Sequence, residues 1–345
     1  MTVADEPEVS VVLPLGYSPW QAAARGRLAG ALAGGRMPHA LLLHGADGLG
    51  KERFAATLAA ALLCGRPAPD LAPCGECADC MLSRAGSHPD LHWLRRPEDR
   101  KSIGVDAVRD ACEQLGMTSL RGGYRVAIVV PADLMTVSAQ NAFLKTLEEP
   151  APRTLLVLVT ARPSRLAATL RSRCQRIEIP RPAEAEGLAW LRGELGMEPP
   201  PDLLALAGGA PLRAVQLAPH YAALEEQMSG LFDALLSGRA EVTRAAADMV
   251  GDGLGARLDW IEWRLSALLR SRLVQDATRV RIPAAAQLQR AAAEVNMEAA
   301  FRCVSRLREC RRLLESPAAP QLLVEALLIE VVATFRRQGV ARWVP

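Results

Sequence analysis

A glycine-rich loop that ends in a lysine is the first stretch whose residue types and spacing could do chemistry. The loop reads Gly45-Ala-Asp-Gly48-Leu-Gly50-Lys51, and it follows the short apolar run 40–44 and precedes a helical pattern. A strand, such a loop, a lysine and a helix, in this order, form a phosphate-binding loop. Its backbone N–H groups cradle phosphate at the start of the helix, and its lysine reaches the outer phosphates. The sequence therefore predicts a P-loop fold with ATP as the candidate ligand.

The groups that a phosphate loop needs for ATP hydrolysis are missing. Glu52 occupies the position where a serine or threonine hydroxyl would hold magnesium, and its carboxylate would meet a triphosphate with like charge. The apolar run 126–130 should lead into the acids that hold the metal and activate water, but Val130 and Pro131 stand there. Asp133 follows too late to replace them without a rerouted turn. We expect weak or absent ATP binding and no hydrolysis; a loop kept only for its turn geometry is the alternative.

Four cysteines have the spacing of a metal site. They are Cys64, Cys74, Cys77 and Cys80, and the last three are separated by two residues each. Four thiolates give zinc a closed tetrahedral shell, which is a structural site without an open position for chemistry. Cysteines that merely happen to cluster are the alternative. His88 is either a further metal candidate or the cap of a turn, and its neighbouring proline favours the turn.

An arginine with a possible role in phosphate chemistry follows the apolar run 155–160. A turn and a short helical segment lead from this run to Ser172-Arg173-Cys174. We expect the guanidinium to lie near the carboxyl edge of a sheet, where ligands of α/β folds gather. An arginine there can stabilise charge on a transferring phosphoryl group. An ordinary solvated or paired surface arginine is the alternative.

The elements that must position these groups are strands and helices in alternation. The apolar runs 40–44, 126–130 and 155–160 have the length and composition of buried strands in a parallel sheet. A helical pattern follows each of them. The first half of the chain is therefore expected to be an α/β domain.

Composition changes after Pro180-Arg-Pro182, and everything beyond it has helical patterning. We expect an α/β domain over 1–180 with a zinc-binding insertion at about 64–80, a small helical lid over 181–219 and an all-α domain over 220–345. Helical bundles of the last kind commonly serve oligomerisation.

The C-terminal part shows helical periodicity over 254–274, 284–310 and 320–338. The segment 302–312 carries several arginines that give its helix one basic side. We favour a solvated face over a DNA contact for these arginines.

Charge and composition limit the partners and the cellular compartment that we expect for this chain. The 345 residues carry a net charge of +3, which allows a local basic face without demanding a nucleic-acid partner. No apolar run approaches the span of a bilayer, and the acidic start lacks the layout of a signal peptide. We therefore expect a cytoplasmic protein with no membrane partner, in which the 8 cysteines are metal ligands or core residues rather than disulfides.

Several segments together are similar to one known family. They are Pro19-Trp20, the four cysteines, Gly86-Ser-His-Pro-Asp90, Gly104-Val-Asp-Ala-Val-Arg109, Asn141-Ala-Phe-Leu-Lys-Thr-Leu-Glu-Glu-Pro150 and Thr169-Leu-Arg-Ser-Arg-Cys174. The sequence resembles the delta-prime subunits of bacterial DNA polymerase III, in the clamp-loader branch of the AAA+ proteins. This resemblance covers nearly the whole chain and is strongest over 19–182.

The resemblance implies an AAA+ P-loop domain, a helical lid and a C-terminal helical collar. It implies a non-hydrolysing subunit of a hetero-pentameric ring with gamma/tau ATPase subunits and delta. Such a ring loads the sliding clamp onto primer-template DNA during replication.

The resemblance also implies roles for individual residues. Arg173, in its Ser172-Arg173-Cys174 motif, would be an arginine finger that reaches the nucleotide of a neighbouring ATPase subunit. The four cysteines would hold structural zinc. Arg213 falls where ATPase relatives have a second sensing arginine. Lys51, which some relatives lack, leaves residual nucleotide affinity open.

Two other functions are compatible with parts of the sequence. One is an active ATPase of the gamma/tau type. The other is a zinc-containing DNA-binding protein, for which the arginine-rich helix and the cysteines would be the supports. ATP turnover by the purified chain and salt-dependent DNA binding separate these three hypotheses.

Overall fold

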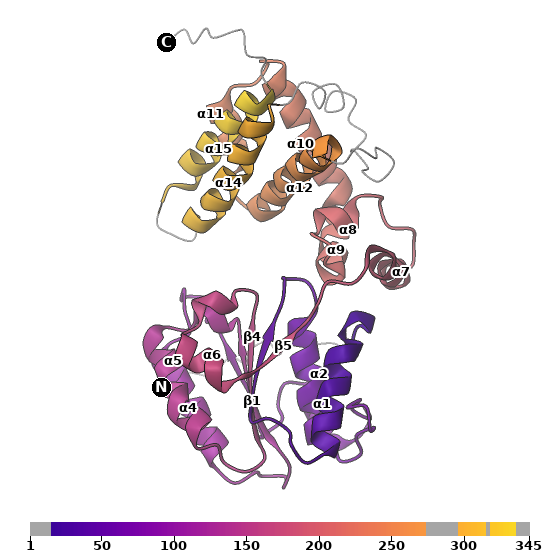
Figure 1. The fold of residues 1–345 in the computed structure, drawn as a ribbon, viewed down its shortest axis with the longest axis vertical. Helices are drawn as coiled ribbons and strands as arrows, with labels where there is room; N and C mark the ends of the chain where they lie inside the picture. Colours follow the sequence, from indigo (N-terminus) through magenta and orange to yellow (C-terminus); the bar gives the residue numbers. More distant parts are fainter. Residues whose placement is uncertain (1–14, 274–295, 315–317, 336–345) are drawn as a thin grey trace, which may run out of the picture. The chain divides into compact units, whose positions relative to one another are not determined.

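The computed structural model describes residues 15–273, 296–314 and 318–335. The acidic start and the first part of the predicted helix 284–310 lie outside these residues. Contacts divide the chain into two units, 1–186 and 187–345 (Figure 1). Among the described residues, no helix has the length and apolarity needed to cross a membrane.

The first unit is built on a parallel sheet of five strands in the order β2-β3-β4-β1-β5. The strands are β1 (Ala40–His44), β2 (Leu91–Arg95), β3 (Arg125–Val130), β4 (Thr154–Thr160) and β5 (Gln175–Glu178). The three predicted strands are confirmed, each to within one residue. β4 is buried along its whole length, as expected for a central strand with both faces covered.

The two remaining strands lack an apolar run, and we did not predict them. In β2 the buried residues Leu91 and Leu94 are separated by half-buried His92 and Trp93. In β5 only Ile177 is buried. Both are the outermost strands of the sheet, so each pairs with only one neighbouring strand and is less covered than a central strand.

Helices cover both faces of the sheet (Figure 1). They are α1 (Ala22–Ala33) and α2 (Lys51–Leu63) on one face, and α4 (Val105–Gly116), α5 (Val137–Glu148) and α6 (Ala168–Arg173) on the other. Apolar side chains of α4, α5 and α6 pack with those of β1, β3 and β4 in one core cluster. The arrangement is an α/β P-loop architecture, in agreement with the predicted fold class. A short helix, α3 (Ala78–Arg84), follows the first three cysteines of the insertion.

Strand register decides which loops can meet. His44 pairs with Thr160, so the loop after β1 starts beside the end of β4. Val129 pairs with Leu158, so β3 ends at the same edge. The carboxyl edge of the sheet therefore collects the glycine-rich loop, the turn after β3 and the end of β4.

The described residues of the second unit form helices joined by short segments, with no strand among them. Its helices are α7 (Glu184–Leu195), α8 (Leu203–Leu206), α9 (Pro211–Leu217), α10 (Tyr221–Leu236), α11 (Val242–Met249), α12 (Leu254–Leu273), α14 (Met297–Leu313) and α15 (Pro320–Phe335). A small apolar cluster joins α7, α8 and α9, and a larger one around Trp260 joins α10 to α15. The boundaries of a lid and a collar within this unit stay a prediction.

Candidate functional site

The glycine-rich loop has the backbone shape that only glycine permits. Gly45 has a φ of +147°, and a Cβ on it would lie 2.4 Å from the carbonyl oxygen of Ile179. Gly48 and Gly50 also adopt positive φ values, of 75° and 77°. The helix α2 begins directly at Lys51. The loop thus keeps the turn geometry of a phosphate-binding loop in front of a helix amino terminus.

The lysine of this loop is bound to the loop itself. Lys51 is only 7% exposed, and its Nζ donates to the carbonyl oxygen of Ala46 at 2.7 Å. Asp47 Oδ1 lies 3.6 Å from the same Nζ. Burial lowers the pKa of Lys51, and the nearby carboxylates of Asp47 and Asp133 oppose that shift. The charge of this lysine is therefore already partly satisfied within the chain.

Glu52 does not stand free beside the loop. Its carboxylate forms an ion pair with Arg95 at the end of β2, and the Arg95 guanidinium also lies 4.5 Å from the centre of the Trp93 ring. The expected like-charge contact with a triphosphate is thus offset by an arginine that sequence reasoning did not connect to this position. The missing hydroxyl is not replaced, because a paired carboxylate offers no alcohol to a magnesium ion.

The end of β3 carries no acid that could activate water. Val130 ends the strand and Pro131 follows it. Asp133 lies in the short turn after them, and its Oδ1 accepts a hydrogen bond from Thr160 Oγ1 at 2.6 Å. The same Oγ1 accepts the N–H of Arg162 at 2.8 Å. Asp133 is thus engaged by the end of β4, and sequence reasoning missed Thr160 because only the strand register brings the two together.

The arginine tip, residues 168–174, comprises α6 and Cys174. Arg173 Nη2 donates to Glu148 Oε1 at 2.6 Å, and its Nη1 donates to the carbonyl oxygen of Thr169 at 3.0 Å. Ser172 Oγ donates to the same carbonyl at 3.0 Å. Both Ser172 and Arg173 are exposed, whereas Cys174 is buried. The predicted finger therefore lies on the surface, held by its own chain.

The expected place of this arginine at the carboxyl edge is wrong. Gln175, two residues later, pairs with Leu41 near the start of β1. The helix of a crossover between parallel strands runs back along the sheet, so its last residues approach the amino edge. His44 lies three residues further along β1, a rise of about 10 Å. Arg173 and the glycine-rich loop are thus separated along the sheet.

The four predicted cysteines come together. Their Sγ atoms all lie within 4.8 Å of one another. The Cys64–Cys77 and Cys74–Cys80 separations are 3.8 Å and 3.9 Å. Zinc–sulfur bonds of about 2.3 Å in a tetrahedron put sulfurs about 3.8 Å apart. The cluster can therefore hold a metal ion, and its size fits zinc.

Backbone N–H groups donate hydrogen bonds to these sulfurs, which favours the thiolate form that binds a cation. Cys64 Sγ accepts N–H groups of Arg66 and Cys74, and Cys77 Sγ accepts that of Cys80. Hydrogen bonds from the N–H groups of Glu76 and Cys77 lower the pKa of Cys74 to about 6. Burial instead raises the pKa of Cys64 and of Cys80. Neighbouring thiols of this kind ionise together with metal binding.

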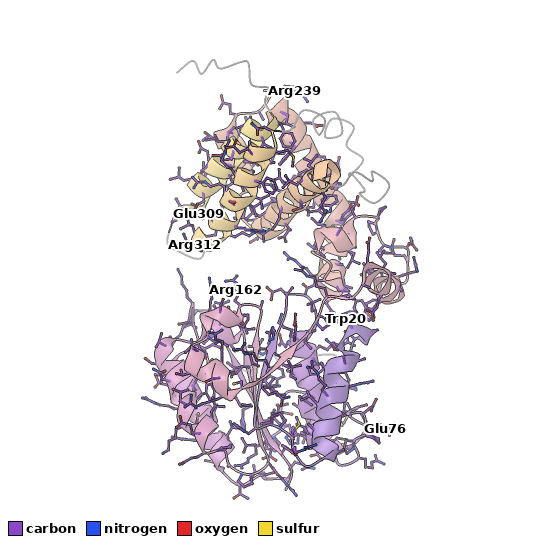
Figure 2. The ribbon with its side chains drawn as sticks, in the orientation of Figure 1. Trp20, Glu76, Arg162, Arg239, Glu309 and Arg312 are labelled. Atoms are coloured by element: carbon purple, nitrogen blue, oxygen red, sulfur yellow. The ribbon has the colours of Figure 1, made fainter. Side chains whose placement is uncertain are left out.

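The cysteine cluster lies away from the carboxyl edge of the sheet. Figure 2 shows Glu76, which lies between two of the cysteines, far from Arg162, which follows β4. His88 is not part of the cluster among the described residues: its Nδ1 accepts the N–H of Asp90 at 3.0 Å. This contact supports its interpretation as the cap of a turn. The four sulfurs therefore come together away from the glycine-rich loop.

Arg213 and the arginine-rich helix are engaged within the second unit. Arg213 forms an ion pair with the buried carboxylate of Asp259, which also binds Arg311 at 2.6 Å. Along α14, Arg302 and Arg306 pair with glutamates of the same helix. These contacts agree with a solvated, internally paired face, and they tie α9 to α12 and α14.

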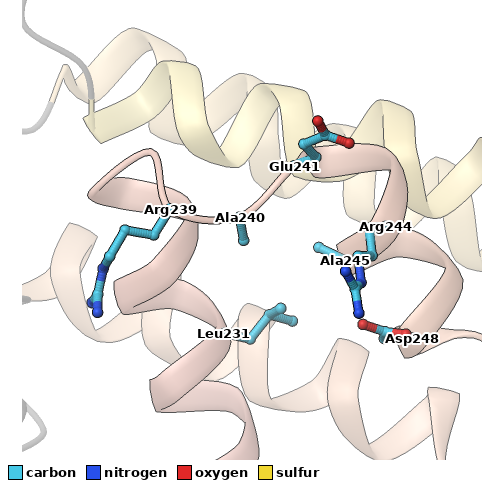
Figure 3. Close-up of a pocket in the computed structure, with 7 residues that line it drawn as sticks. All are labelled: Leu231, Arg239, Ala240, Glu241, Arg244, Ala245 and Asp248. Carbon is cyan, nitrogen blue, oxygen red and sulfur yellow. The ribbon is translucent and has the colours of Figure 1, made fainter.

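A hollow in the second unit is lined by residues of α10, of α11 and of the segment between them. Figure 3 shows the side chains of Arg244 and Asp248, both on α11, pointing toward one another, and places Arg239 and Glu241 on the segment that joins α10 to α11. Side chains of both signs line this hollow, so it favours no ligand of a single charge. None of the predicted site residues contributes to it.

Comparison with known proteins gives consistent matches. The family model "DNA polymerase III, delta subunit" matches residues 20–183. The DNA polymerase III subunit delta′ of Pseudomonas aeruginosa is 40% identical over 265 residues, 75% of this chain and 79% of the relative. That of Escherichia coli K12 is 33% identical over 335 residues, 95% of this chain and 99% of the relative. A solved structure of a DNA polymerase III gamma subunit-related protein from Thermotoga maritima aligns over 90% of this chain and 99% of its own, with 20% identity and a TM-score of 0.47.

Proposed function

The chain belongs to the family of DNA polymerase III delta′ subunits, and from this premise we propose that it is a clamp-loader scaffold subunit that supplies an arginine to a neighbouring ATPase. Its work in this proposal is to hold a ring together and to complete the nucleotide site of another subunit. The partners are gamma/tau ATPase subunits and delta in a hetero-pentamer, which acts on the sliding clamp and primer-template DNA in the cytoplasm.

The separation of Arg173 from the glycine-rich loop carries this proposal. About 10 Å of strand lies between the level of Gln175, which follows the arginine tip, and the level of His44, which precedes the loop. This arginine is therefore placed away from a phosphate on its own loop. On the surface it is accessible to another subunit instead. In that position it would stabilise the charge that develops on a phosphoryl group during transfer.

The absence of hydrolysis is the second part of the proposal. Val130 and Pro131 offer no carboxylate, and Asp133 is engaged by Thr160. Lys51 is turned onto the carbonyl oxygen of Ala46, which a bound phosphate would have to replace. ATP binding is accordingly weak or absent. These contacts speak against an active gamma/tau-type ATPase.

Structural zinc is the third part. The four sulfur atoms would hold the ion and close the loop between α2 and α3, and the zinc would supply only cross-linking. Because arginines of α14 pair with glutamates of the same helix, a zinc-containing DNA reader is disfavoured. The domain division at 180 and 220, into P-loop domain, lid and collar, belongs to the same proposal.

Reconstitution of the full chain with its ATPase partner and delta tests this function. We expect the isolated chain to hydrolyse no ATP above a protein-free blank. In the complex, the Arg173→Ala variant should assemble normally but slow both clamp loading and DNA-stimulated ATP hydrolysis. Catalytic turnover by the isolated chain, or loading at the normal rate by the variant, would contradict the proposal.

A further inference from the structure

The guanidinium of Arg173 is folded back onto its own subunit. Its Nη1 donates to the carbonyl oxygen of Thr169, four residues earlier in the same short helix. Its Nη2 donates to a carboxylate oxygen of Glu148, the last residue of α5. Two of the five N–H groups of an arginine are thereby used within the chain. An arginine that reaches for a partner's phosphate in this orientation first has to leave these contacts.

Packing fixes the two helices that carry this pair. Leu147 of α5 and Leu170 of α6 are both buried in the apolar cluster on this face of the sheet. Glu148 and Arg173 therefore emerge side by side from a rigid base, while their charged ends stay at the surface. Their side chains are 53% and 36% exposed.

We propose that Glu148 holds Arg173 in an inactive orientation through their ion pair. The nucleotide phosphate of a neighbouring subunit must displace this carboxylate before the arginine can act. This inference rests on the proposed function, because it assigns a regulatory contact to the same arginine. Glu148 is thus a positioning residue that touches neither nucleotide nor substrate.

The free energy of the Glu148–Arg173 ion pair is small enough for a phosphate to displace it. Exposed ion pairs contribute at most about 1 kcal/mol, because water screens them and two long side chains lose freedom. A terminal phosphate carries more charge than a carboxylate, and it can engage the fork of a guanidinium with two oxygens. Glu148 can therefore bind the arginine in the unassembled or resting ring. At a closed interface, a phosphate can replace Glu148 as the partner of the guanidinium.

The Glu148→Gln variant removes the competing charge and keeps the side-chain shape. In the reconstituted complex, we expect it to raise basal ATP turnover, without clamp or DNA, by about two- to fivefold. The turnover stimulated by clamp and DNA should hardly change, because the arginine is already released in that state. The stimulation ratio therefore falls, which the loss of a merely structural contact would not cause.

A neighbouring glutamate provides the matched control. Glu149 is exposed, and its change to glutamine should leave basal and stimulated turnover as they are. The double variant Arg173→Ala with Glu148→Gln should turn over as slowly as Arg173→Ala alone. Thermal unfolding of each variant chain should match that of the original.

The results separate this inference from the proposed function. In one outcome, Arg173→Ala slows ATP turnover by the complex while Glu148→Gln leaves basal turnover unchanged or lowers it. In that case the inactive orientation held by Glu148 is refuted and the proposed function stands. A rise in the double variant above Arg173→Ala would also refute it, since Glu148 would then act on something else. If Arg173→Ala has no effect, both statements fail together.

Discussion

The glycine-rich loop and the arginine tip carry comparable charges on one sheet, yet the protein holds them in opposite ways. At the loop, Lys51 is buried against Ala46, and Asp133 is bound by the buried hydroxyl of Thr160. At the tip, Arg173 is held only by exposed contacts. Buried contacts are costly to break, whereas exposed ion pairs are not.

This difference separates a region whose charged groups are committed to the fold from one whose charged group can be released at small cost. The loop has kept the backbone of a nucleotide site, but its charged side chains are committed to the fold. The tip contributes little to the fold and keeps its charge available. Substitutions at the loop should therefore change stability more than activity, and substitutions at the tip should do the reverse.

The largest effect on stability should come from the cysteine cluster, which lies outside both regions. The Cys77→Ser change removes one of four sulfurs, and we expect zinc content to fall well below one equivalent and the melting temperature to drop by several degrees. Metal analysis of fresh, untagged protein and thermal unfolding measure both. Cys112→Ser serves as a control, because Cys112 lies outside the cluster. Full zinc content in the Cys77 variant would exclude the assigned ligand set.

A smaller effect is expected where the end of β4 meets the turn after β3. The Thr160→Val change removes the hydroxyl that donates to Asp133 and leaves this carboxylate without that partner. The free energy of unfolding should fall by about 1–3 kcal/mol. Arg173→Ala, measured beside it by denaturant titration, should cost less than about 1 kcal/mol. Equal costs would erase the contrast between the two regions.

The smallest effect should follow from restoring the residue that a metal-binding loop requires. Glu52→Thr supplies the missing hydroxyl, but Val130 and Pro131 still offer no carboxylate. We expect the isolated variant to remain without ATP turnover, because one restored ligand does not activate water. Assays at high protein concentration would detect a gain, and a clear gain would mean that Asp133 can take over the missing role.

Local patterns in the sequence predict a large part of this molecule. The three central strands, the glycine-rich loop and the cysteine cluster each depend on residues close together in the chain. Their burial and spacing can be read without knowing the fold. The two edge strands escaped prediction because they lack an apolar run.

The contacts that define the site could not be predicted in the same way. Glu52 meets Arg95, and Asp133 meets Thr160, only because a particular strand order brings distant segments together. The pairing of Arg173 with Glu148 likewise depends on how two helices pack on one face. The expected place of Arg173 was wrong for the same reason, since the direction of its short helix follows from the crossover.

The most direct test of the account compares one substitution in each region within the same assembly. The reconstituted complex is assayed for clamp- and DNA-stimulated ATP hydrolysis with the original chain, with Lys51→Ala and with Arg173→Ala. We predict that Lys51→Ala keeps the original rate and that Arg173→Ala lowers turnover at the adjoining site by roughly three orders of magnitude. A loss of turnover with Lys51→Ala and an unchanged rate with Arg173→Ala would contradict the account.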